Sequence, residues 1–542
     1  MTIPLAPPQI LLDATPLSLG LMRAVLAAPV RVDLSASAWA AVRQGRAALE
    51  RAAEGGQPIY GMTTGVGAMK HKSHAGAEMA AFNQGLGFAH AVAVGEPVPV
   101  GVARLALLLR LNTIASGRVG VTEDFARFLV RMIAQDILPR MHRRGSVGCG
   151  DLGQLGQLAA VMGGAGDVVW QGREMPAAEA FAAVGLSPYQ MAPREGLAAV
   201  ASNSYGLAAA AAAVFAARDR IRLALAQAPV TALAWGLDRT VWAAAAQSLM
   251  PMERELARFL GEATALQAEW PARASVHDAL SGRFLVQVLA PCLIAAQEAA
   301  EALHLASAQV DDNPALDHEG RVLTSGASHH GVIALRLGAL QGALAQLSRN
   351  LANHCLMLTG GQLPGLPVNL VPPGVAATGY GPLMKLVAEQ NARIAAAAAP
   401  VAPFALTLAA GLEDEALLLP LTAERLAEQA EALGWVLTVI AAVSVQAVAQ
   451  RGIVPTAGLA AQMTALVRQH LAPFEGDVPL GAPLSALRAT LDAQSTLQTL
   501  LSGCAFLPET AADLPLFVAA EAAPLPSGDD RSDDLKTLDQ PT

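Results

Sequence analysis

The chain has 542 residues, of which 53% are hydrophobic, 4% aromatic and 15% charged, and its formal net charge at pH 7 is −9. This balance excludes a mostly disordered chain, and because no basic block stands out, it gives no electrostatic footprint for nucleic-acid binding. Ala and Leu dominate, which favours helices over strands, so we expect an all-α fold.

Residues 1–205 are expected to form an N-terminal helical domain that is interrupted by glycine-rich loops. Apolar residues recur at helical spacing over 17–54, 77–92 and 101–138. Glycine-rich segments, which we expect to be loops, lie at 59–75, 144–156 and 192–204.

Residues 206–455 are expected to form a central bundle of long helices. Long apolar patterns cover 206–228, 283–308, 330–358, 381–399 and 422–450. Helices that are apolar nearly all round must be buried, in a bundle or between subunits, so we expect a homo-oligomer. The run 432–450 is long enough to raise the question of a membrane span, but its two glutamines and small residues favour a buried helix, and no membrane partner is expected.

The C-terminal end of the chain is expected to be a smaller helical part at 456–523, followed by a disordered polar tail at 524–542. Four cysteines are scattered without a C-x-x-C pair, and the N-terminus lacks the early Lys or Arg of a signal peptide. We therefore expect a cytoplasmic protein in a reducing compartment.

Tyr60 is one of only four tyrosines and lies in the glycine-rich sequence YGMTTGVG. A phenol on a mobile loop suits a general acid or base if its pKa is lowered. The alternative is a tyrosine that anchors the loop through its hydroxyl group.

The segment RRGSVGCGDLGQLGQLA (143–159) carries glycines ahead of a predicted helix, with Asp151 as a plausible N-cap. Such a turn can hold an anion, although no Gly-Lys-Ser/Thr of a P-loop follows. A thiol near a helix N-terminus can have a lowered pKa, so Cys149 is a candidate reactive group; the alternative is a buried inert thiol.

Polar residues between the apolar helices are further candidates. Arg283 needs a carboxylate partner, which could be a substrate or Asp278. Asn313 could position backbone or substrate. His329 and His330 could suggest a metal, but no His-Glu-x-x-His motif or carboxylate cage accompanies them, so no metal site is expected.

Taken in order, these segments resemble the aromatic amino acid lyase family, which includes histidine, phenylalanine and tyrosine ammonia-lyases and the related aminomutases. The resemblance runs from about residue 17 to about residue 505. The matching segments are YGMTTGVG (60–67), FAHAVAVGEPV (88–98), GSVGCGDL (145–152), REGLA (194–198), HDALSGR (277–283), VDDNPA (310–315), SGASHHG (325–331) and GLEDEA (411–416). Each match is weak alone, but eight in the family's order make the resemblance specific.

The resemblance implies an all-α homotetramer in which the chains share each active site. It implies that Tyr60 is the catalytic base, that His90 lies in the substrate pocket and that Arg283 grips the substrate carboxylate. Asn313 and Glu413 also match the family's positions.

Three expected substrate-binding positions differ from the family's pattern. The Asn expected after GLA-x-x is Ala201, with Asn203 just beyond it. His277 stands where the family has Gln, and Ser328-His329 replaces Asn-Phe. We therefore include Asn203, His277 and His329 among the candidate substrate-binding residues.

The family's cofactor motif is also altered. The family builds an electrophile, methylideneimidazolone, from Ala-Ser-Gly by cyclisation and loss of water from the serine. Here the segment is one residue shorter and reads Gly148-Cys149-Gly150. Cyclisation with loss of hydrogen sulfide would involve Cys149 and Gly150 in catalysis. The shortened loop argues against formation of the ring, so the sequence leaves open whether this cofactor is present.

The resemblance implies a carbon–nitrogen lyase that eliminates the amine from a histidine-like or other aromatic amino acid. Without an electrophile a primary amine leaves poorly, and acid–base groups supply only about 10²–10⁴-fold. From a trimethylammonium betaine such as ergothioneine, the substrate of the related ergothionase, trimethylamine would leave without that help. The residues also leave open a non-catalytic binding or scaffold protein and a metal-dependent hydrolase that uses His329 and His330.

Overall fold

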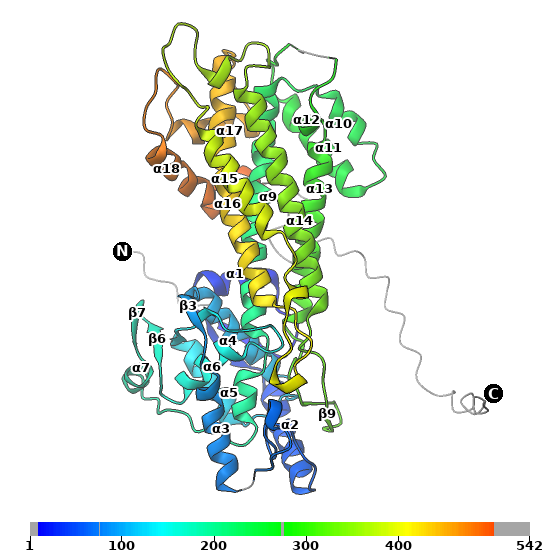
Figure 1. Cartoon of the computed structure of the whole chain (residues 1–542), viewed down its shortest axis with the longest axis vertical. Coiled ribbons are helices and arrows are strands. Elements are labelled where there is room, and N and C mark those ends of the chain that lie inside the picture. The colour runs from blue at the N-terminus through cyan, green and yellow to red at the C-terminus, as the bar shows by residue number, and fades with distance from the viewer. Residues whose placement is uncertain (1–8, 75, 273–275, 503–542) are drawn as a thin grey trace, which may run out of the picture.

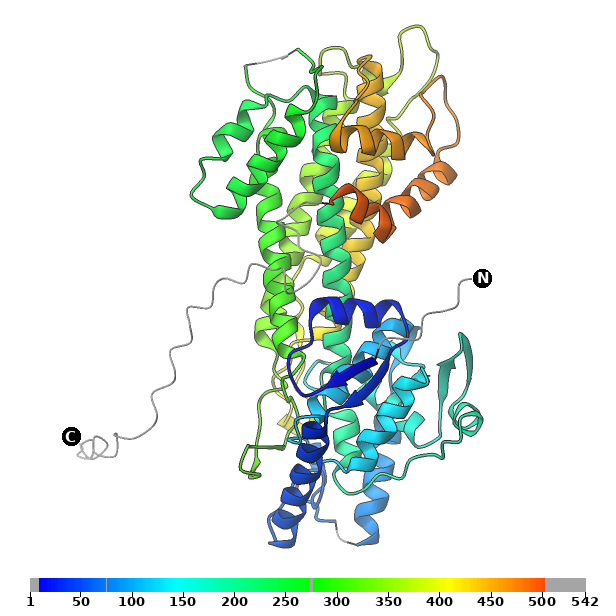
Figure 2. The same ribbon diagram turned by 180° about the vertical axis from the view of Figure 1, so that it is seen from behind.

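The computed structural model describes residues 9–74, 76–272 and 276–502. Helices dominate this part of the chain, with an N-terminal region at one end of the long axis and a bundle of long helices at the other (Figures 1 and 2). The predicted all-α fold is confirmed in this main feature, although short strands add small sheets. The predicted tail at 524–542 lies outside the described residues.

The N-terminal region is built from short and medium helices. They are α1 (Leu19–Ala27), α2 (Ala36–Glu54), α3 (Ala77–His90), α4 (Val100–Ile114), α5 (Glu123–Ala134), α6 (Leu152–Met162), α7 (Ala177–Ala183) and α8 (Glu195–Val200). From Val102 onward α4 is buried at every residue, so it forms the core of this region. Residues 195–200 form α8 where a loop is predicted, because this apolar turn is buried throughout and packs against α3 and α6.

Short strands pair in small sheets within the described residues. β1 (Gln9–Leu12) runs parallel to β2 (Arg31–Leu34), with Gln9 opposite Arg31. The antiparallel sheets are β3 (Val94–Pro97) with β5 (His142–Arg144), β6 (Asp167–Trp170) between β4 (Leu138–Pro139) and β7 (Arg173–Pro176), and β8 (Ala315–Leu316) with β9 (Val322–Leu323).

The long bundle consists of α9 (Ser204–Trp235), α13 (Leu285–Ala306), α14 (Gly331–Thr359), α15 (Leu383–Ala397) and α16 (Leu419–Gln450). Shorter helices cover its outer end and side, namely α10 (Thr240–Ala245), α11 (Pro251–Ala265), α12 (Leu280–Arg283), α17 (Gly458–Arg468), α18 (Gly481–Asp492) and α19 (Gln494–Leu500). The 3-10 turns are η1 (Gly67–Met69), η2 (Val368–Leu370), η3 (Ala402–Phe404) and η4 (Ala409–Gly411).

The central pair of the bundle is α9 and α16, which are buried along most of their length. Polar groups on them bond across the pair: Gln227 Nε2 donates to Leu437 O at 3.0 Å, and the hydroxyls of Thr231 and Ser444 lie 3.0 Å apart. Such bonds offset the cost of burying polar side chains in an apolar core.

Within the described residues, three segments are long and apolar enough to cross a membrane by length and composition alone: Glu195–Trp235, Leu285–Ala306 and Leu419–Gln450. The protein itself buries 83%, 61% and 89% of their most apolar windows, respectively. The prediction of a buried helix at 432–450 is therefore confirmed.

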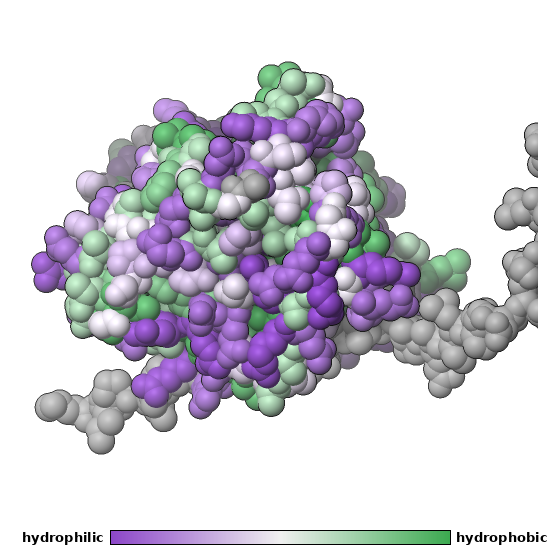
Figure 3. Space-filling view, turned by 90° about the horizontal axis from the view of Figure 1, so that it is seen from below, coloured by the Kyte–Doolittle hydropathy of each residue, from purple (hydrophilic) through white to green (hydrophobic). Residues whose placement is uncertain are grey.

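Two connections of the bundle return to the N-terminal region and build one side of the site. Residues 307–330 join α13 to α14, and residues 398–418 join α15 to α16. They are tied down there, since Leu316 N–H donates to Arg118 O and Leu418 N–H donates to Val147 O. Seen from below, this end of the molecule mixes hydrophilic and hydrophobic residues (Figure 3).

Candidate active site

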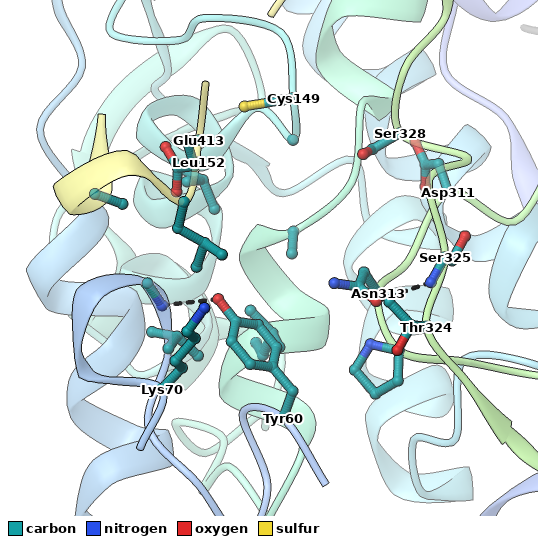
Figure 4. Close-up of a pocket in the computed structure, with 18 of the residues that line it drawn as sticks. Tyr60, Lys70, Cys149, Leu152, Asp311, Asn313, Thr324, Ser325, Ser328 and Glu413 are labelled. Atoms are coloured by element: carbon teal, nitrogen blue, oxygen red, sulfur yellow. Dashed lines mark hydrogen bonds between the residues drawn. The ribbon is translucent and has the colours of Figure 1, made fainter. Parts of the chain in front are cut away.

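A cavity of about 870 Å³ lies where the N-terminal region meets the two connections of the bundle. Its walls come from segments far apart in the sequence: 57–70, the end of α3, the loop before α6, α8, 311–328 and 409–415 (Figure 4). It brings together Tyr60, His90, Cys149, Gly150, Asn313 and Glu413 of the predicted site residues.

The loop that carries Tyr60 is closed by its own backbone. Gly61 has φ +69°, and a Cβ there would lie 2.3 Å from Leu197 Cδ2, so glycine is required for this close approach to α8. Gly67 N–H then donates to the Tyr60 hydroxyl oxygen at 2.7 Å. The phenol oxygen is thereby held toward the cavity by an amide that favours its negative form.

The Tyr60 phenol is half-buried, and burial raises its pKa. The Gly67 amide lowers the pKa and the Glu413 carboxylate raises it, and the net direction is upward. Tyr60 is therefore protonated at neutral pH in the free protein, in contrast to the lowered pKa that a general base would prefer.

The side chain of Asn203 bonds to both ends of the loop Gly148–Gly150. Its Oδ1 accepts the Gly150 N–H at 2.7 Å, and its Nδ2 donates to Gly148 O at 2.9 Å and to Ser328 O at 3.0 Å. Asn203 is fully buried and lies behind the loop rather than on the cavity wall. Its substrate-binding role stays a prediction, while its contacts here are with the loop.

Cys149 lies on the cavity wall, but its thiol is not activated. Burial raises its pKa to about 11, and the nearby carboxylates of Glu413 and Asp151 contribute to the rise. The interpretation that a helix N-terminus lowers this pKa is wrong, because burial and two carboxylates outweigh that effect. The thiol is thus neutral at physiological pH.

The backbone around Cys149 fits the ring closure that the family uses, while the side chain differs. Gly148 and Gly150 have φ of +80° and +91°, and the Asn203 amide touches both backbone groups that the ring would join, the Gly148 carbonyl and the Gly150 nitrogen. Closure here would expel sulfide from Cys149 in place of a serine hydroxyl. When formed, this group supplies an electrophile for the amine.

His90 and Asn313 present polar groups from opposite sides. His90 ends α3, and its Nδ1 lies 2.8 Å from Leu86 O, which can only accept, so the neutral ring carries its proton on Nδ1 and leaves Nε2 as an acceptor. Asn313 Oδ1 accepts Ser325 N–H at 3.0 Å, and its amide nitrogen points into the cavity (Figure 4).

The cavity wall is rich in carboxylates. Glu413 lies close to Tyr60 and Cys149, and Asp414 and Glu415 follow it on the wall. On the opposite side is Asp311, which is buried; its Oδ2 accepts Asn203 N–H at 2.6 Å and lies 3.5 Å from His330 Nε2.

The other carboxylate oxygen of Asp311, Oδ1, is buried and has no hydrogen-bond partner among the described residues. Burial tends to raise the Asp311 pKa, but His330, Arg110 and the Asn203 amide together lower it, so Asp311 is ionised. The cavity therefore suits a cationic group.

Besides Asn203, three further predicted site residues do not line this cavity. His329 is on the surface, with Nε2 3.8 Å from Glu415 Oε1. His277 and Arg283 lie at the far end of the bundle, where Gly282 packs against Trp235 and Leu237 at the end of α9. Because Asn203 caps the start of α9, whose 32 residues span about 48 Å, Arg283 is far from Tyr60 of its own chain.

Arg283 does not pair with Asp278, the intramolecular partner that the sequence offers. Asp278 Oδ2 accepts the Asp238 N–H at 2.8 Å, and in the described part of the chain no ion pair joins Asp278 to Arg283. The guanidinium instead lies near the Phe284 ring, 5.9 Å from its centroid. Arg283 is thus available to a group outside its own chain.

Sequence reasoning missed Lys70, Asp311 and Ser328 on the cavity wall. Lys70 follows the Tyr60 loop in the sequence, which is the one signal that could have drawn attention to it. The sequence shows two adjacent aspartates in VDDNPA, Asp311 and Asp312, but it does not show which of the two side chains faces the cavity. The other member, Asp312, is buried in ion pairs with Arg110 and Arg194 and supports the wall from behind.

No group of three or more His, Cys, Asp or Glu side chains that could hold a metal occurs among the described residues. His330 is buried against Asp311, whereas His329 is exposed beside Glu415. The two histidines therefore face different surroundings, which removes the geometric basis for a hydrolase that uses both.

Residues 17–469 match the family model described as aromatic amino acid lyase. The chain therefore belongs to the aromatic amino acid lyase family and is a carbon–nitrogen lyase, as its motifs and its cavity indicate.

Within the family, the chain is 28% identical over 490 residues to the histidine ammonia-lyase of Paracidovorax citrulli (strain AAC00-1), and the match covers 89% of this chain and 96% of that protein. It is 31% identical over 358 residues to the histidine ammonia-lyase of Deinococcus radiodurans, covering 65% and 68%. Among solved structures it is similar in fold to ergothionase from Treponema denticola in complex with desmethyl-ergothioneine sulfonic acid, with a TM-score of 0.85, 22% identity and coverage of 90% and 99%.

Proposed function

We propose that the protein eliminates the amine from a histidine-like or other aromatic α-amino acid and releases an α,β-unsaturated acid. The observation that carries this proposal is the Tyr60 oxygen, bound to Gly67 N–H, on the same cavity wall as Glu413. A base and an acidic group for the amine are the minimum that such an elimination needs.

The described residues divide the reaction between them. Tyr60 removes the β-proton, the electron pair of that bond forms the double bond, and the C–N bond breaks so that the amine leaves with its electron pair. Glu413 and Asp311 face the nitrogen as it leaves, and the Nε2 of His90 accepts a hydrogen bond from the aromatic ring's polar group. Gly67 N–H stabilises the phenolate that acts as base.

The substrate carboxylate needs a cation, and we propose that Arg283 of a second copy provides it. Arg283 has no ion pair among the described residues and lies about the length of α9 from its own cavity. Exposed apolar side chains on α14, among them Val332 and Leu335, give copies a surface on which to associate. We therefore propose a homotetramer in which copies share sites.

The proposal is tested by ultraviolet absorbance of the unsaturated acid after incubation with histidine, phenylalanine, tyrosine or ergothioneine. We expect product from at least one, and Tyr60→Phe to reduce kcat by about 10²-fold or more because it removes the base. Tyr380→Phe is the control, since Tyr380 is buried away from the cavity beside Phe474. No product from any substrate, or equal rates for parent and Tyr60→Phe, would contradict the proposal.

Cys149 in place of the family's serine favours a second candidate substrate, a trimethylammonium betaine of the same amino acid. Its nitrogen leaves as neutral trimethylamine, so the elimination needs no electrophile on the enzyme. The carboxylates of Glu413 and Asp311 complement its permanent positive charge.

Intact mass and the relative turnover of histidine and ergothioneine together distinguish the two substrates. A mass lower than the calculated value by one hydrogen sulfide and one water accompanies ammonia release, because that loss marks the ring. An unchanged mass, together with faster turnover of ergothioneine than of histidine, identifies the betaine as substrate. An unchanged mass with faster turnover of histidine would exclude the betaine as the preferred substrate.

A further inference from the structure

Lys70 is the one lysine or arginine on the wall of the cavity within the described residues. It follows η1 directly, and its side chain points toward the Tyr60 hydroxyl (Figure 4). Its ammonium group has no hydrogen-bond or ion-pair partner among the described residues, and the side chain is exposed. It is thus free to reorient within the cavity.

The same short turn supplies two groups to Tyr60. Gly67 N–H donates to the phenol oxygen at 2.7 Å, and Lys70 N–H donates to Gly67 O at 3.1 Å, which fixes the start of the lysine side chain relative to that amide. A single turn therefore contributes the amide that donates to the phenol oxygen and carries the lysine whose side chain points toward it.

The remaining charges around Tyr60 oppose a phenolate. Glu413 raises the pKa of Tyr60, and Asp414, Glu415 and Asp311 add negative charge to the wall. The other titratable groups on the wall are His90 from the end of α3 and Cys149 from the loop before α6, whose thiol is neutral. Among the described residues of this wall, Lys70 is the one ammonium or guanidinium group that opposes these carboxylates.

We propose that the Lys70 ammonium stabilises the phenolate of Tyr60 and so sets the pH range in which Tyr60 acts as a base. The proposal rests on the proposed function of Tyr60, and Lys70 acts through that residue without touching the reacting atoms. An opposite charge within about 4–6 Å favours the ionised form of a group, and solvent screening keeps the effect moderate at an exposed lysine.

The test is a spectroscopic titration of the phenolate that needs no substrate. The near-ultraviolet phenolate signal is followed with pH for the parent and for Lys70→Met. From each curve we subtract the curve of the same protein carrying Tyr60→Phe, which isolates Tyr60 from the other three tyrosines. We expect Lys70→Met to raise the Tyr60 midpoint by about one pH unit. Because lysine and tyrosine titrate in the same range, the parent's value belongs to the pair.

Two further variants separate charge from structure. Lys70→Arg keeps its charge throughout the titration, so it should hold the midpoint at or below the parent's value. Lys72→Met is the matched control, because Lys72 is exposed on the same loop and lies outside the cavity wall. It should leave the midpoint unchanged.

Kinetics provide the second readout. In Lys70→Met, the acidic limb of the pH profile of kcat/KM should shift to higher pH by the same amount as the Tyr60 titration midpoint. An unchanged midpoint in Lys70→Met would overturn the proposal, and a rise in KM alone would show that Lys70 holds the substrate carboxylate instead. If no substrate is turned over, the proposed function fails while the titration still decides the question of Lys70.

Discussion

Asp151 is a fully buried carboxyl group directly behind the Cys149 loop. It accepts hydrogen bonds from Gly206 N–H at 2.6 Å and from Ser146 Oγ at 3.0 Å. Burial raises its pKa to about 7, and these bonds offset only part of that rise. The group is therefore largely protonated in the folded protein under mildly acidic conditions.

The raised pKa of Asp151 makes the folding stability depend on pH. Because the folded pKa is higher than the unfolded one, the folded state binds more protons between about pH 4 and pH 7, and stability falls as pH rises through that window. The slope from this one group is at most about 1.4 kcal/mol per pH unit. We expect Asp151→Asn to flatten the pH dependence of the unfolding free energy, as measured by denaturant titration.

The control for this prediction is Asp167→Asn, which removes an exposed carboxylate on β6. It should leave the slope of the parent intact. A parent and an Asp151→Asn variant with the same pH dependence between pH 4 and pH 7 would show that Asp151 does not titrate in this window.

Single residues differ in how well the sequence predicts them. Tyr60, Asn313 and Glu413 reach the cavity as their motifs indicate, because each lies within a segment whose order in the chain matches the family. The ionisation of Cys149 could not be predicted, since it depends on Glu413, which only the folded chain brings near. Lys70 was missed although it follows the Tyr60 loop, because the sequence does not show the direction of its side chain.

The crossing of α3 and α6 sets the position of His90 at the cavity. Gly87 of α3 lies against α6, and a Cβ at that position would come within 2.5 Å of Ala159 Cβ. Gly85 is on the same helix, and a Cβ there would meet nothing within 4 Å. The two glycines thus differ in their surroundings while sharing one helix.

We expect Gly87→Ala to destabilise the protein by about 1–3 kcal/mol, because α3 and α6 must separate to admit the methyl group. Gly85→Ala should instead stabilise it by about 0.5–1 kcal/mol through helix propensity. Both are measured by denaturant unfolding. Equal effects of the two substitutions would show that the crossing is not tightly packed.

Elements could be predicted where their pattern is long and regular. The apolar pattern from 206 predicts α9 but ends at 228, whereas the helix continues through Pro229 to Trp235. Packing against α16 compensates for the hydrogen bond that proline cannot donate. The short helix α8 escaped prediction because its glycine-rich surroundings are typical of a loop, and only its burial reveals it.

At the scale of the whole molecule, the separation of Arg283 from the cavity of its own chain makes shared sites testable. Tyr60→Phe and Arg283→Met should each have strongly reduced activity alone. Co-expressed in equal amounts, they should regain activity, because about a quarter of sites combine an intact Tyr60 with an intact Arg283 from different copies. Turnover by the mixed assembly, compared with each variant alone, measures this.

The matched control pairs Tyr60→Phe with Glu413→Gln. Both residues line the cavity of one chain, so no mixture of these variants restores an intact wall. Recovery in this second mixture, or its absence in the first, would contradict a site completed by Arg283 of another copy.

The pairing of α9 with α16 has a consequence for the newborn chain. Thr231 and Ser444, which bond across this pair, are 213 positions apart in the sequence. At typical rates of translation, α9 leaves the ribosome about ten to forty seconds before α16. During that interval α9, which is apolar and long enough to span a lipid bilayer, lacks the helix that buries it. We therefore expect the nascent polypeptide to depend on chaperones until α16 emerges.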